Sequence, residues 1–371
     1  MSNLSKVRHD MLPNLPPPAS SVGVIGWMRA NLFSNITNSV LTLFALYLLY
    51  ILLTPTISWV FINSDWTGSS RDACTSGGAC WVFVANRFDQ FMYGFYPEAE
   101  IWRINLTFLL LVAQVLWLML PNLPYKGMVA AVVLLVFPIL AYFLLYGGSF
   151  GLEVVETHKW GGLSLTLVLA IVGIVAALPF GVLLALGRRS EMPIVKSFCV
   201  VYIEFWRGIP LITVLFMASV MLPLFVPEEM NFDKLLRAMI GIVMFQSAYM
   251  AEVVRGGLQA IPKGQYEAAQ ALGLNYWKMM VFVVLPQALK LMIPGIVNTF
   301  IALFKDTSLV LIIGLFDLLA IVQAGLTDPK WLGFSVEGYA FVAFVFWVFC
   351  FGMSKYSQHL ENRFHTGHGS R

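Results

Sequence analysis

Two oppositely charged residues stand side by side between two apolar stretches of the sequence. Lys305 and Asp306 are followed directly by Thr307 and Ser308, and the preceding apolar stretch contains Asn298. Charges flanked by apolar residues in this way usually line a pathway or pair with each other. The polar side chains therefore predict a polar passage or a binding site. The alternative is an internal Lys305–Asp306 pair that only fixes a turn.

A second polar group lies in another apolar stretch, between about Leu235 and Val254. Gln246 and Tyr249 are three residues apart, so in a helix they share one face. Unpaired polar groups are costly in apolar surroundings. These two side chains therefore either bind a ligand or hydrogen-bond a neighbouring helix, and the sequence leaves both alternatives open.

Cys74 and Cys80 lie six residues apart in a polar stretch that is rich in glycine and serine. In an oxidising compartment this spacing permits a disulfide. The alternative is two free thiols. Cys199 and Cys350 fall in or beside apolar segments, and we expect them to be inert.

The sequence lacks the residues of several kinds of catalytic site. It contains no Gly-x-x-x-x-Gly-Lys-Ser/Thr phosphate loop, so we expect no ATP hydrolysis on this chain. No His/Cys cluster has the spacing of metal ligands, and His359, His365 and His368 lie in a short C-terminal stretch. Serine, histidine and aspartate residues are scattered over the loops. We therefore predict no catalytic residues, no metal site and no cofactor on this chain.

A polar insert follows the second apolar stretch, from Ile261 to Gly273 and on to Gln287. It is expected to form two short helices with a glycine bend between them. Gly264 can cap the first helix, and Gly273 suits the left-handed position that closes it. Asn275 can cap the second helix, which Pro286 is expected to end. A protruding helix pair of this kind fits the groove of another protein, although an ordinary helical hairpin is the alternative.

The composition indicates the surroundings of these residues. The chain has 371 residues, of which 59% are hydrophobic and only 12% are charged. Soluble domains carry roughly twice that charged fraction. The net charge of +3 is too small to indicate nucleic-acid binding. We therefore predict an all-α integral membrane protein.

Eight stretches are apolar enough to cross a membrane, which takes about 20 residues. They lie at about 36–62, 104–120, 127–146, 161–186, 208–226, 235–254, from 286 onward, and 338–352. Residues 194–206 are expected to form an interfacial helix. Within the fourth stretch, small residues recur every four positions, which predicts a face for close helix packing: Gly173, Ala177, Gly181 and Ala185.

The distribution of lysine and arginine predicts the orientation of these spans. Basic residues gather in the same alternate loops if both termini are cytoplasmic, and the other loops are then richer in acidic residues. Residues 1–35 are then a cytoplasmic tail without the features of a signal peptide. The loop 63–100, with Cys74 and Cys80, lies outside. We expect the apolar run 309–326 to be a buried, partly re-entrant segment, since a ninth span would place the basic C-terminus outside.

The polar insert also matches a known signature. Glu267-Ala268-Ala269, then Gly273, then Leu285-Pro286 resembles the EAA loop of ABC importer permeases, the loop that docks onto the ATPase. The resemblance assigns ATPase docking to five residues: Gln265, Glu267, Ala268, Ala269 and Gly273.

Other stretches resemble the polar amino acid permease family, the histidine/glutamine type. They are 161–166, 202–211, 248–265, 305–309 and 313–319. The first 160 residues depart from the minimal five-span form, and the extended form resembles the larger permease subunit of general L-amino acid importers. The resemblance divides the chain into a tail (1–35), three additional spans with a periplasmic loop (36–147, loop 63–100), a permease core (148–358, docking loop 258–286) and a C-terminal tail (359–371).

The resemblance implies a permease subunit of an ATP-driven amino acid importer in the bacterial inner membrane, working by alternating access. The implied partners are a second permease in a heterodimer, an ATPase dimer that holds ATP and Mg, and a periplasmic amino-acid-binding protein. Lys305 would receive the substrate carboxylate and Asp306 its ammonium group. The alternative is a secondary transporter driven by an ion gradient, whose typical paired, interrupted segments are not evident in the sequence.

Overall fold

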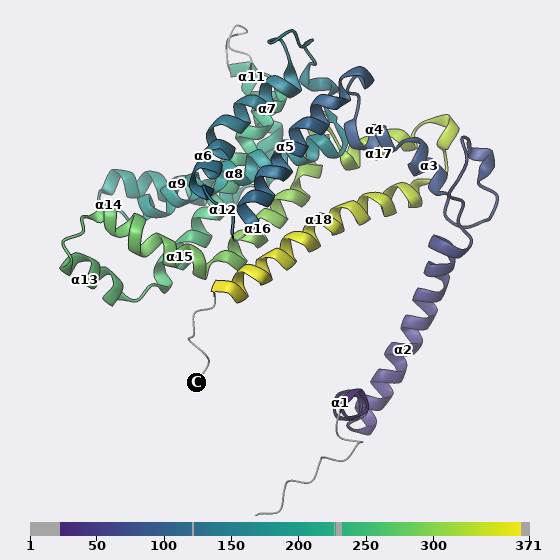
Figure 1. The fold of residues 1–371 in the computed structure, drawn as a ribbon, viewed down its shortest axis with the longest axis horizontal. Coiled ribbons are helices and arrows are strands. Elements are labelled where there is room, and N and C mark those ends of the chain that lie inside the picture. The colour runs from purple at the N-terminus through teal and green to yellow at the C-terminus, as the bar shows by residue number, and fades with distance from the viewer. Residues whose placement is uncertain (1–22, 121, 226, 228–231, 365–371) are drawn as a thin grey trace, which may run out of the picture. The chain divides into compact units, whose positions relative to one another are not determined.

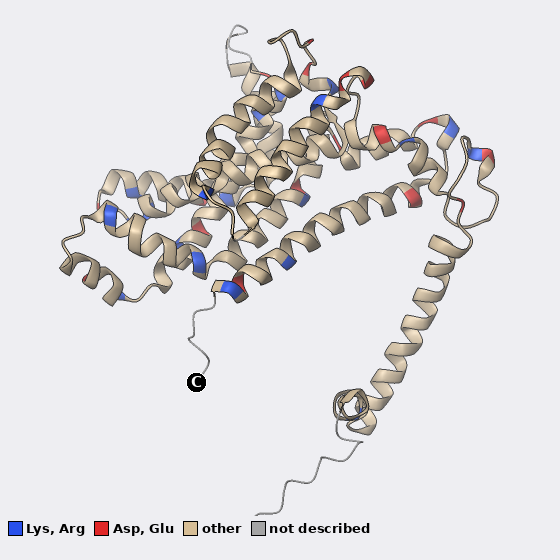
Figure 2. Cartoon of the chain, viewed as in Figure 1, with Lys and Arg blue, Asp and Glu red and all other residues tan. Residues whose placement is uncertain are grey.

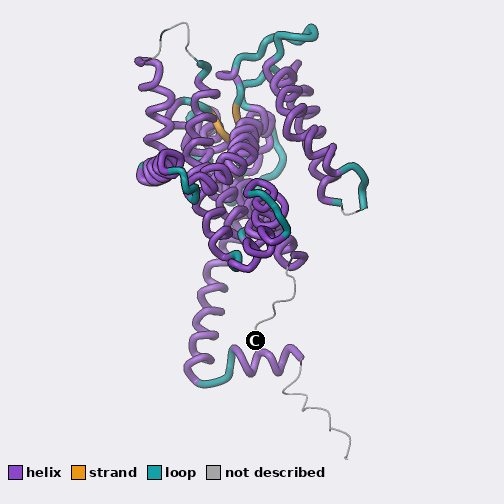
Figure 3. The backbone as a smooth tube through the Cα atoms, turned by 90° about the vertical axis from the view of Figure 1, so that its left-hand side faces the viewer, coloured by secondary structure: helices purple, strands orange, loops and turns teal. Residues whose placement is uncertain are grey.

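The computed structural model describes residues 23–120, 122–225, 227 and 232–364. Most of the expected N-terminal tail lies outside these residues, as do His365 and His368. The described chain is helical almost throughout (Figure 3), and its one named strand, β1, has only two residues, Phe316–Asp317. The predicted all-α fold is confirmed.

The chain divides into two compact units, Met1–Gly68 with Asp72–Cys80, and Ser69–Arg71 with Trp81–Arg371. The described part of the first unit begins with α1 (Gly23–Asn31) and α2 (Ile36–Ile57). The Asn35 side chain caps α2 by accepting a hydrogen bond from the Asn38 amide. Helix α2 carries no charged residue (Figure 2) and continues through a π-helical segment to Ile62, which gives a length sufficient to cross a membrane.

The second unit contains the remaining helices (Figure 1). Before the predicted core (148–358) come α3 (Trp81–Asn86), α4 (Phe88–Tyr93), α5 (Ile101–Met119), α6 (Lys126–Ala131) and α7 (Phe137–Tyr146). The core begins with α8 (Gly162–Arg188), α9 (Pro193–Gly208), α10 (Leu211–Phe216), α11 (Leu222–Phe225) and α12 (Lys234–Ala260). It continues with α13 (Lys263–Ala271), α14 (Tyr276–Met279), α15 (Leu285–Leu291), α16 (Ile293–Asp306), α17 (Leu318–Leu326) and α18 (Ser335–Phe364).

Six helical stretches of the described chain are long and apolar enough to cross a membrane: Ile36–Ile62, Glu98–Met119, Lys126–Tyr146, Gly162–Arg188, Ile293–Ile313 and Ser335–Phe364. The predicted interfacial helix at 194–206 and the predicted span at 208–226 correspond to Pro193–Gly208 and Leu211–Phe225, which meet at a bend of 102°. Helix α12 has 27 residues, enough to cross, but it carries Arg237, Gln246 and Glu252. If the bent pair and α12 each cross the membrane once, the six candidate spans become the predicted eight, and this number stays a prediction.

The predicted small-residue face of α8 is confirmed. Gly173, Ala177, Gly181 and Ala185 are all buried. A Cβ atom on Gly181 would lie 2.6 Å from Met250 Cβ on α12, and one on Gly173 would lie 2.7 Å from Leu303 Cδ2 on α16. Helix α8 therefore packs closely against both α12 and α16.

Residues 81–96 pack against the predicted core through backbone as well as side chains. An isolated β-bridge pairs Gly94 with Trp160, and two more within the core pair Gly161 with Phe316 and Gly162 with Asp317. A Cβ atom on Gly94 would lie 2.4 Å from the Gly161 Cα atom, so the two backbones touch. This part of the N-terminal extension is therefore packed into the same unit as the core.

Side chains strengthen this contact. The ring of Phe83 on α3 lies 5.6 Å from both the Phe91 ring and the Trp331 ring, centroid to centroid. Arg87 forms an ion pair with Asp328, which follows α17. Helices α3 and α4 thereby hold the segment between α17 and α18.

The apolar run 309–326 is broken into short pieces. A 3₁₀ segment (Thr307–Ile313) ends at Gly314 in the left-handed region, and β1 leads into α17. Asp317 is fully buried and caps α17 by accepting hydrogen bonds from the Leu319 and Ala320 amides. At 1.5 Å per residue the nine residues of α17 cannot cross the roughly 30 Å hydrocarbon core. The run is no ninth span.

Candidate docking surface and substrate path

The polar insert folds into two helical arms with a bend at Gly273. Gly273 has φ of 75°, and the Leu274 amide donates to the Ala269 carbonyl at 3.2 Å, which closes α13 as predicted. The Asn275 side chain accepts from the Lys278 amide at 3.0 Å, which confirms the predicted cap of the second arm. The predicted cap at Gly264 is wrong. Helix α13 begins at Lys263 after Pro262, so Gly264 lies inside the helix.

Pro286 does not end the second arm, contrary to the prediction. Helix α14 continues through a π-helical segment, Met280–Val284, directly into α15. Pro286 occupies the first turn of α15, where a proline is tolerated because its missing N–H needs no helical partner. The π segment changes the hydrogen-bond pattern just before the proline, and the arm stays helical.

The five predicted docking residues divide into two groups. Gln265, Glu267, Ala268 and Gly273 are exposed. Ala269 is only 3% exposed and packs into the base of the insert with Leu258, Ile261, Met279, Met280 and Val284. Four of the five are therefore available to a partner, and Ala269 holds α13 in place.

Leu272 is a candidate contact residue that the sequence analysis missed. Its side chain is 80% exposed at the end of α13, next to the bend at Gly273. Trp277 at the start of the second arm is also exposed. An apolar side chain directly before a helix-closing glycine is a signal that was present in the sequence.

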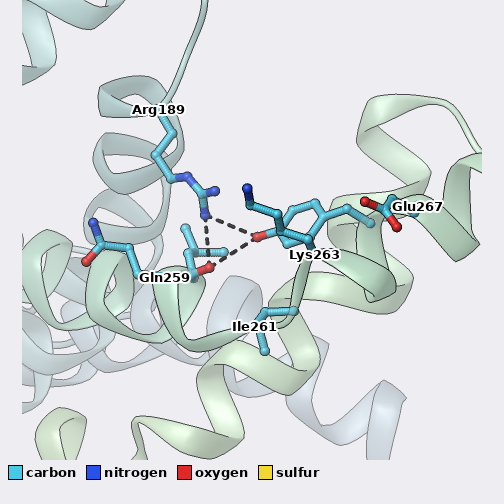
Figure 4. Close-up of a pocket in the computed structure, with 7 residues that line it drawn as sticks. Arg189, Gln259, Ile261, Lys263 and Glu267 are labelled. Carbon is cyan, nitrogen blue, oxygen red and sulfur yellow. Dashed lines mark hydrogen bonds between the residues drawn. The ribbon is translucent and has the colours of Figure 1, made fainter.

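A cavity of about 420 Å³ lies behind α13 (Figure 4). It is lined by Arg189, Leu258, Gln259, Ile261, Lys263, Tyr266 and Glu267. Arg189 Nη1 donates to the Leu258 carbonyl at 3.0 Å and to the Tyr266 hydroxyl at 3.1 Å. The cavity therefore lies where the end of α8, the end of α12 and α13 meet.

The predicted substrate-path residues around Lys305 lie at the end of α16. Lys305 is exposed and Asp306 is half-buried. Among the described residues, neither takes part in an ion pair. The alternative of an internal Lys305–Asp306 pair stays a prediction that a double variant can test. Thr307 and Ser308 donate their hydroxyl protons to the Phe304 and Lys305 carbonyls, at 2.8 and 2.9 Å.

The remaining predicted path residues are dispersed. Gln246 is buried and donates from Nε2 to the Thr299 carbonyl at 2.8 Å, which links α12 to α16. Tyr249 is 37% exposed, and the Arg207 guanidinium lies 5.6 Å from the centre of its ring. Asn298 is exposed on α16. Gln246 therefore makes the helix-to-helix bond that was one of its two alternatives.

An ionic cluster joins the ends of three helices near the insert. Glu252 on α12 accepts from Arg188 of α8 at 2.8 Å and from Arg255 at 2.7 Å. Arg188 also pairs with Glu204 of α9 at 3.0 Å. Glu252 and Arg255 are three residues apart, so their contact is expected from the sequence, whereas the Arg188–Glu252 contact joins residues 64 positions apart and is not.

In the first unit, a disulfide joins Cys74 and Cys80, whose Cα atoms are 5.6 Å apart. The Ser76 amide and hydroxyl between them donate to the Asp65 carboxylate at 3.1 and 2.8 Å. These bonds, the one from the backbone amide first, lower the pKa of Asp65. The loop is therefore closed at two points, by the disulfide and by Asp65.

In intact membranes we predict that neither Cys74 nor Cys80 reacts with a membrane-impermeant thiol reagent until a reductant is added. The reason is that a disulfide has no thiolate to react, and a loop outside the membrane is reached by reductant and reagent alike. Mass spectrometry of the labelled peptide measures the result. Labelling of both residues without reductant would identify free thiols, and labelling only after the membrane is opened would reverse the predicted orientation.

Comparisons with known proteins show the family of this chain. The profile of the family described as "Binding-protein-dependent transport system inner membrane component" matches residues 177–366. The chain is 57% identical over 359 residues to the inner membrane amino-acid ABC transporter permease protein YhdY of Escherichia coli (strain K12), which covers 96% of this chain and 98% of that protein.

Two further similarities were found. The chain is 40% identical over 440 residues to the glutamate/glutamine/aspartate/asparagine transport system permease protein BztC of Rhodobacter capsulatus, covering 99% of this chain and all of that protein. A solved structure of an amino acid ABC transporter with histidines contains a chain that is 30% identical and covers 54% of this chain and 92% of its own length, with a TM-score of 0.48. The family profile matches residues 177–366, and the two permeases YhdY and BztC match almost the whole chain. The chain therefore belongs to the family of binding-protein-dependent transport system inner membrane components.

Proposed function

We propose that this chain is the transmembrane permease subunit of an ATP-driven importer for amino acids in the bacterial inner membrane. The family assignment and the amino-acid permeases that match the whole chain support this proposal. The family implies an ATPase and a substrate-binding protein as partners. We further propose that a second permease subunit forms a heterodimer with this chain, and that ATP and Mg bind only to the ATPase. Both termini are proposed to be cytoplasmic.

The observation that carries the proposal is the polar insert between α12 and α16. It presents Gln265, Glu267, Ala268 and Leu272 to solvent on a helix whose other side is fixed by Ala269. Gln287 Nε2 of α15 donates to Gln265 Oε1 at 3.0 Å, which ties the two arms together. A rigid, exposed helix of this kind is suited to a groove on the ATPase. An ion-driven transporter has no use for such an insert.

The proposed substrate path includes Lys305 and Asp306. A free amino acid carries a carboxylate and an ammonium group. The Lys305 ammonium can pair with the carboxylate, and the Asp306 carboxylate can pair with the ammonium group. The neighbouring Ser308 supplies a hydroxyl oxygen that can still accept a hydrogen bond, whereas Thr307 is fully buried. Gln246, Tyr249 and Asn298 are proposed to line other parts of the path. The substrate is proposed to cross by alternating access, driven from the ATPase through the insert.

The proposal is tested at the exposed face of α13. We predict that Leu272→Asp or Glu267→Lys leaves the permease folded but lowers co-purification of the ATPase roughly tenfold or more, about 1.4 kcal/mol of binding. An aspartate at position 272 would have to be desolvated in an apolar contact, and a few central residues dominate most interfaces. Quantitative pull-down from membranes, with uptake in vesicles, measures both effects.

Leu332→Asp is the matched control, because Leu332 is 50% exposed and lies outside the insert. It is expected to keep wild-type co-purification. If both insert variants retain the ATPase at wild-type yield and transport normally, the docking assignment is wrong. Uptake that survives ATP depletion while an ion gradient is intact would instead identify the ion-driven alternative.

A further inference from the structure

We propose that Arg189 is a positioning residue that links the docking helix α13 to α8 and transmits movement of α13 into the membrane bundle. This inference rests on the proposed function, because it requires the ATPase to move α13. Its basis is the contact of three segments at a single guanidinium group (Figure 4).

Arg189 is the first residue after α8, and its side chain reaches residues far along the sequence. Nη1 donates to the Leu258 carbonyl at 3.0 Å and to the Tyr266 hydroxyl at 3.1 Å. Tyr266 in turn donates its hydroxyl proton to the Leu258 carbonyl at 3.2 Å. The guanidinium carbon also lies 5.7 Å from the centre of the Tyr266 ring. The three groups therefore form a closed triangle.

Each side of this triangle has a physical reason. Leu258 lies in the last turn of α12, whose carbonyl groups have no partner within the helix. A cation at a helix C-terminus is favourable because the helix dipole is negative there. The planar guanidinium can donate to two acceptors and also lie over an aromatic ring, which a lysine ammonium cannot do in the same geometry. Arg189 is thus suited to holding α12 and α13 together.

The adjacent residue, Arg188, points into a different set of contacts. It binds Glu252 of α12 at 2.8 Å and Glu204 of α9 at 3.0 Å. The two arginines at the end of α8 therefore fix it in two directions. Arg188 attaches it to the bundle, and Arg189 attaches it to the docking insert.

Helix α8 can carry a displacement further, because it is packed tightly along its small-residue face. Gly181 meets Met250 of α12, and Gly173 meets Leu303 of α16, two residues before Lys305. Close-packed interfaces transmit shifts rather than absorbing them. A contiguous chain of contacts thus runs from Tyr266 through Arg189 and α8 to the helix that ends at the proposed substrate path. Coupling along this chain of contacts is measured as amino acid uptake per ATP hydrolysed.

The experiment uses the assembled transporter in proteoliposomes, with ATPase and binding protein. Tyr266→Phe keeps the aromatic ring and removes the hydroxyl. Arg189→Lys keeps the positive charge and removes the planar guanidinium group with its several N–H donors. Three quantities are measured: ATPase co-purification, the rate of ATP hydrolysis, and amino acid uptake per ATP hydrolysed. Both variants are expected to retain the ATPase and hydrolysis at wild-type level, with uptake per ATP lowered roughly threefold to tenfold. Arg189→Ala is expected to lower it further.

Gln259→Ala is the matched control, because Gln259 lines the same cavity from α12 and lies outside both the triangle and the docking helix α13. It is expected to keep wild-type uptake per ATP. Wild-type uptake per ATP in both Tyr266→Phe and Arg189→Lys would overturn the inference. Loss of the ATPase from Tyr266→Phe would also overturn it, because the triangle would then only maintain the docking surface. Failure of the wild-type chain to bind any ATPase would instead reject the proposed function. If Arg189→Ala does not fold, Tyr266→Phe still tests the inference, because it removes only one hydroxyl group.

Discussion

Replacing Gly162 with alanine is expected to prevent stable folding of the permease core. Gly162 has φ of +65°, and a Cβ atom there would lie 2.4 Å from the Phe91 carbonyl oxygen. The backbone conformation alone costs of order 1–3 kcal/mol for a non-glycine residue. The contact adds to this cost, because the nearest atoms belong to the backbone of α4 and cannot rotate away.

Movement of α4 would disturb several other contacts. Gly162 is bridged to Asp317, the buried cap of α17, and Gly161 is bridged to Phe316. The Thr166 hydroxyl accepts from the Leu318 amide at 3.0 Å in the same region. We therefore expect a loss of roughly 3 kcal/mol or more. The measurements are the yield of monodisperse protein in detergent and its midpoint of thermal unfolding.

Gly127→Ala is the matched control, because a Cβ atom at this helical position meets nothing within 4 Å. It is expected to be neutral or slightly stabilising, since alanine favours helix over glycine by up to about 1 kcal/mol. Equal yields and equal midpoints for Gly162→Ala and Gly127→Ala would contradict the prediction. They would mean that α4 is not held against α8 in the way described.

Lys305→Met is expected to lower amino acid uptake at least a hundredfold, about 2.7 kcal/mol. Lys305 is exposed at the end of α16, and in the described chain it has no ion-pair partner. Its charge is therefore available to a substrate carboxylate, which would lose its counter-charge in the variant. Co-purification of the ATPase is expected to stay at wild-type level, because the polar insert is unchanged. Uptake by a panel of amino acids in vesicles measures the effect.

A double variant separates substrate binding from internal pairing. If Lys305 and Asp306 only neutralised each other, Lys305→Met with Asp306→Leu would restore much of the uptake, because neither variant side chain then leaves a partner charge unpaired. We expect no such recovery. Lys330→Met, at another exposed lysine, is the control and should transport normally. Recovery in the double variant would reject the substrate role of Lys305.

The sequence by itself determined the features that depend on neighbouring residues. Hydropathy over about 20 residues revealed the membrane class and the approximate places of the long helices, because lipid selects for continuous apolar stretches. Gly273 and Asn275 indicated the bend of the insert, since helix ends follow local backbone preference. The four-residue spacing on α8 predicted its packing face. The motifs of the core indicated the family, which the comparisons confirmed.

Only the tertiary structure decided the features that depend on distant residues. Pro286 has the same local preference in any sequence, but here the π segment before it keeps the arm helical. Gln246 and Tyr249 share a helix face, yet Gln246 bonds α16 while Tyr249 lies beneath Arg207.

Longer-range pairings were even less accessible to the sequence analysis. Arg189 meets Tyr266 across 77 residues, and Arg87 meets Asp328 across 241. Local periodicity carries no information about such pairs, because each residue fits its own helix or loop equally well whether or not the other residue is present. They are fixed only when the helices pack, and it is at these long-range contacts that the docking helix is joined to α8 and the N-terminal extension to the core.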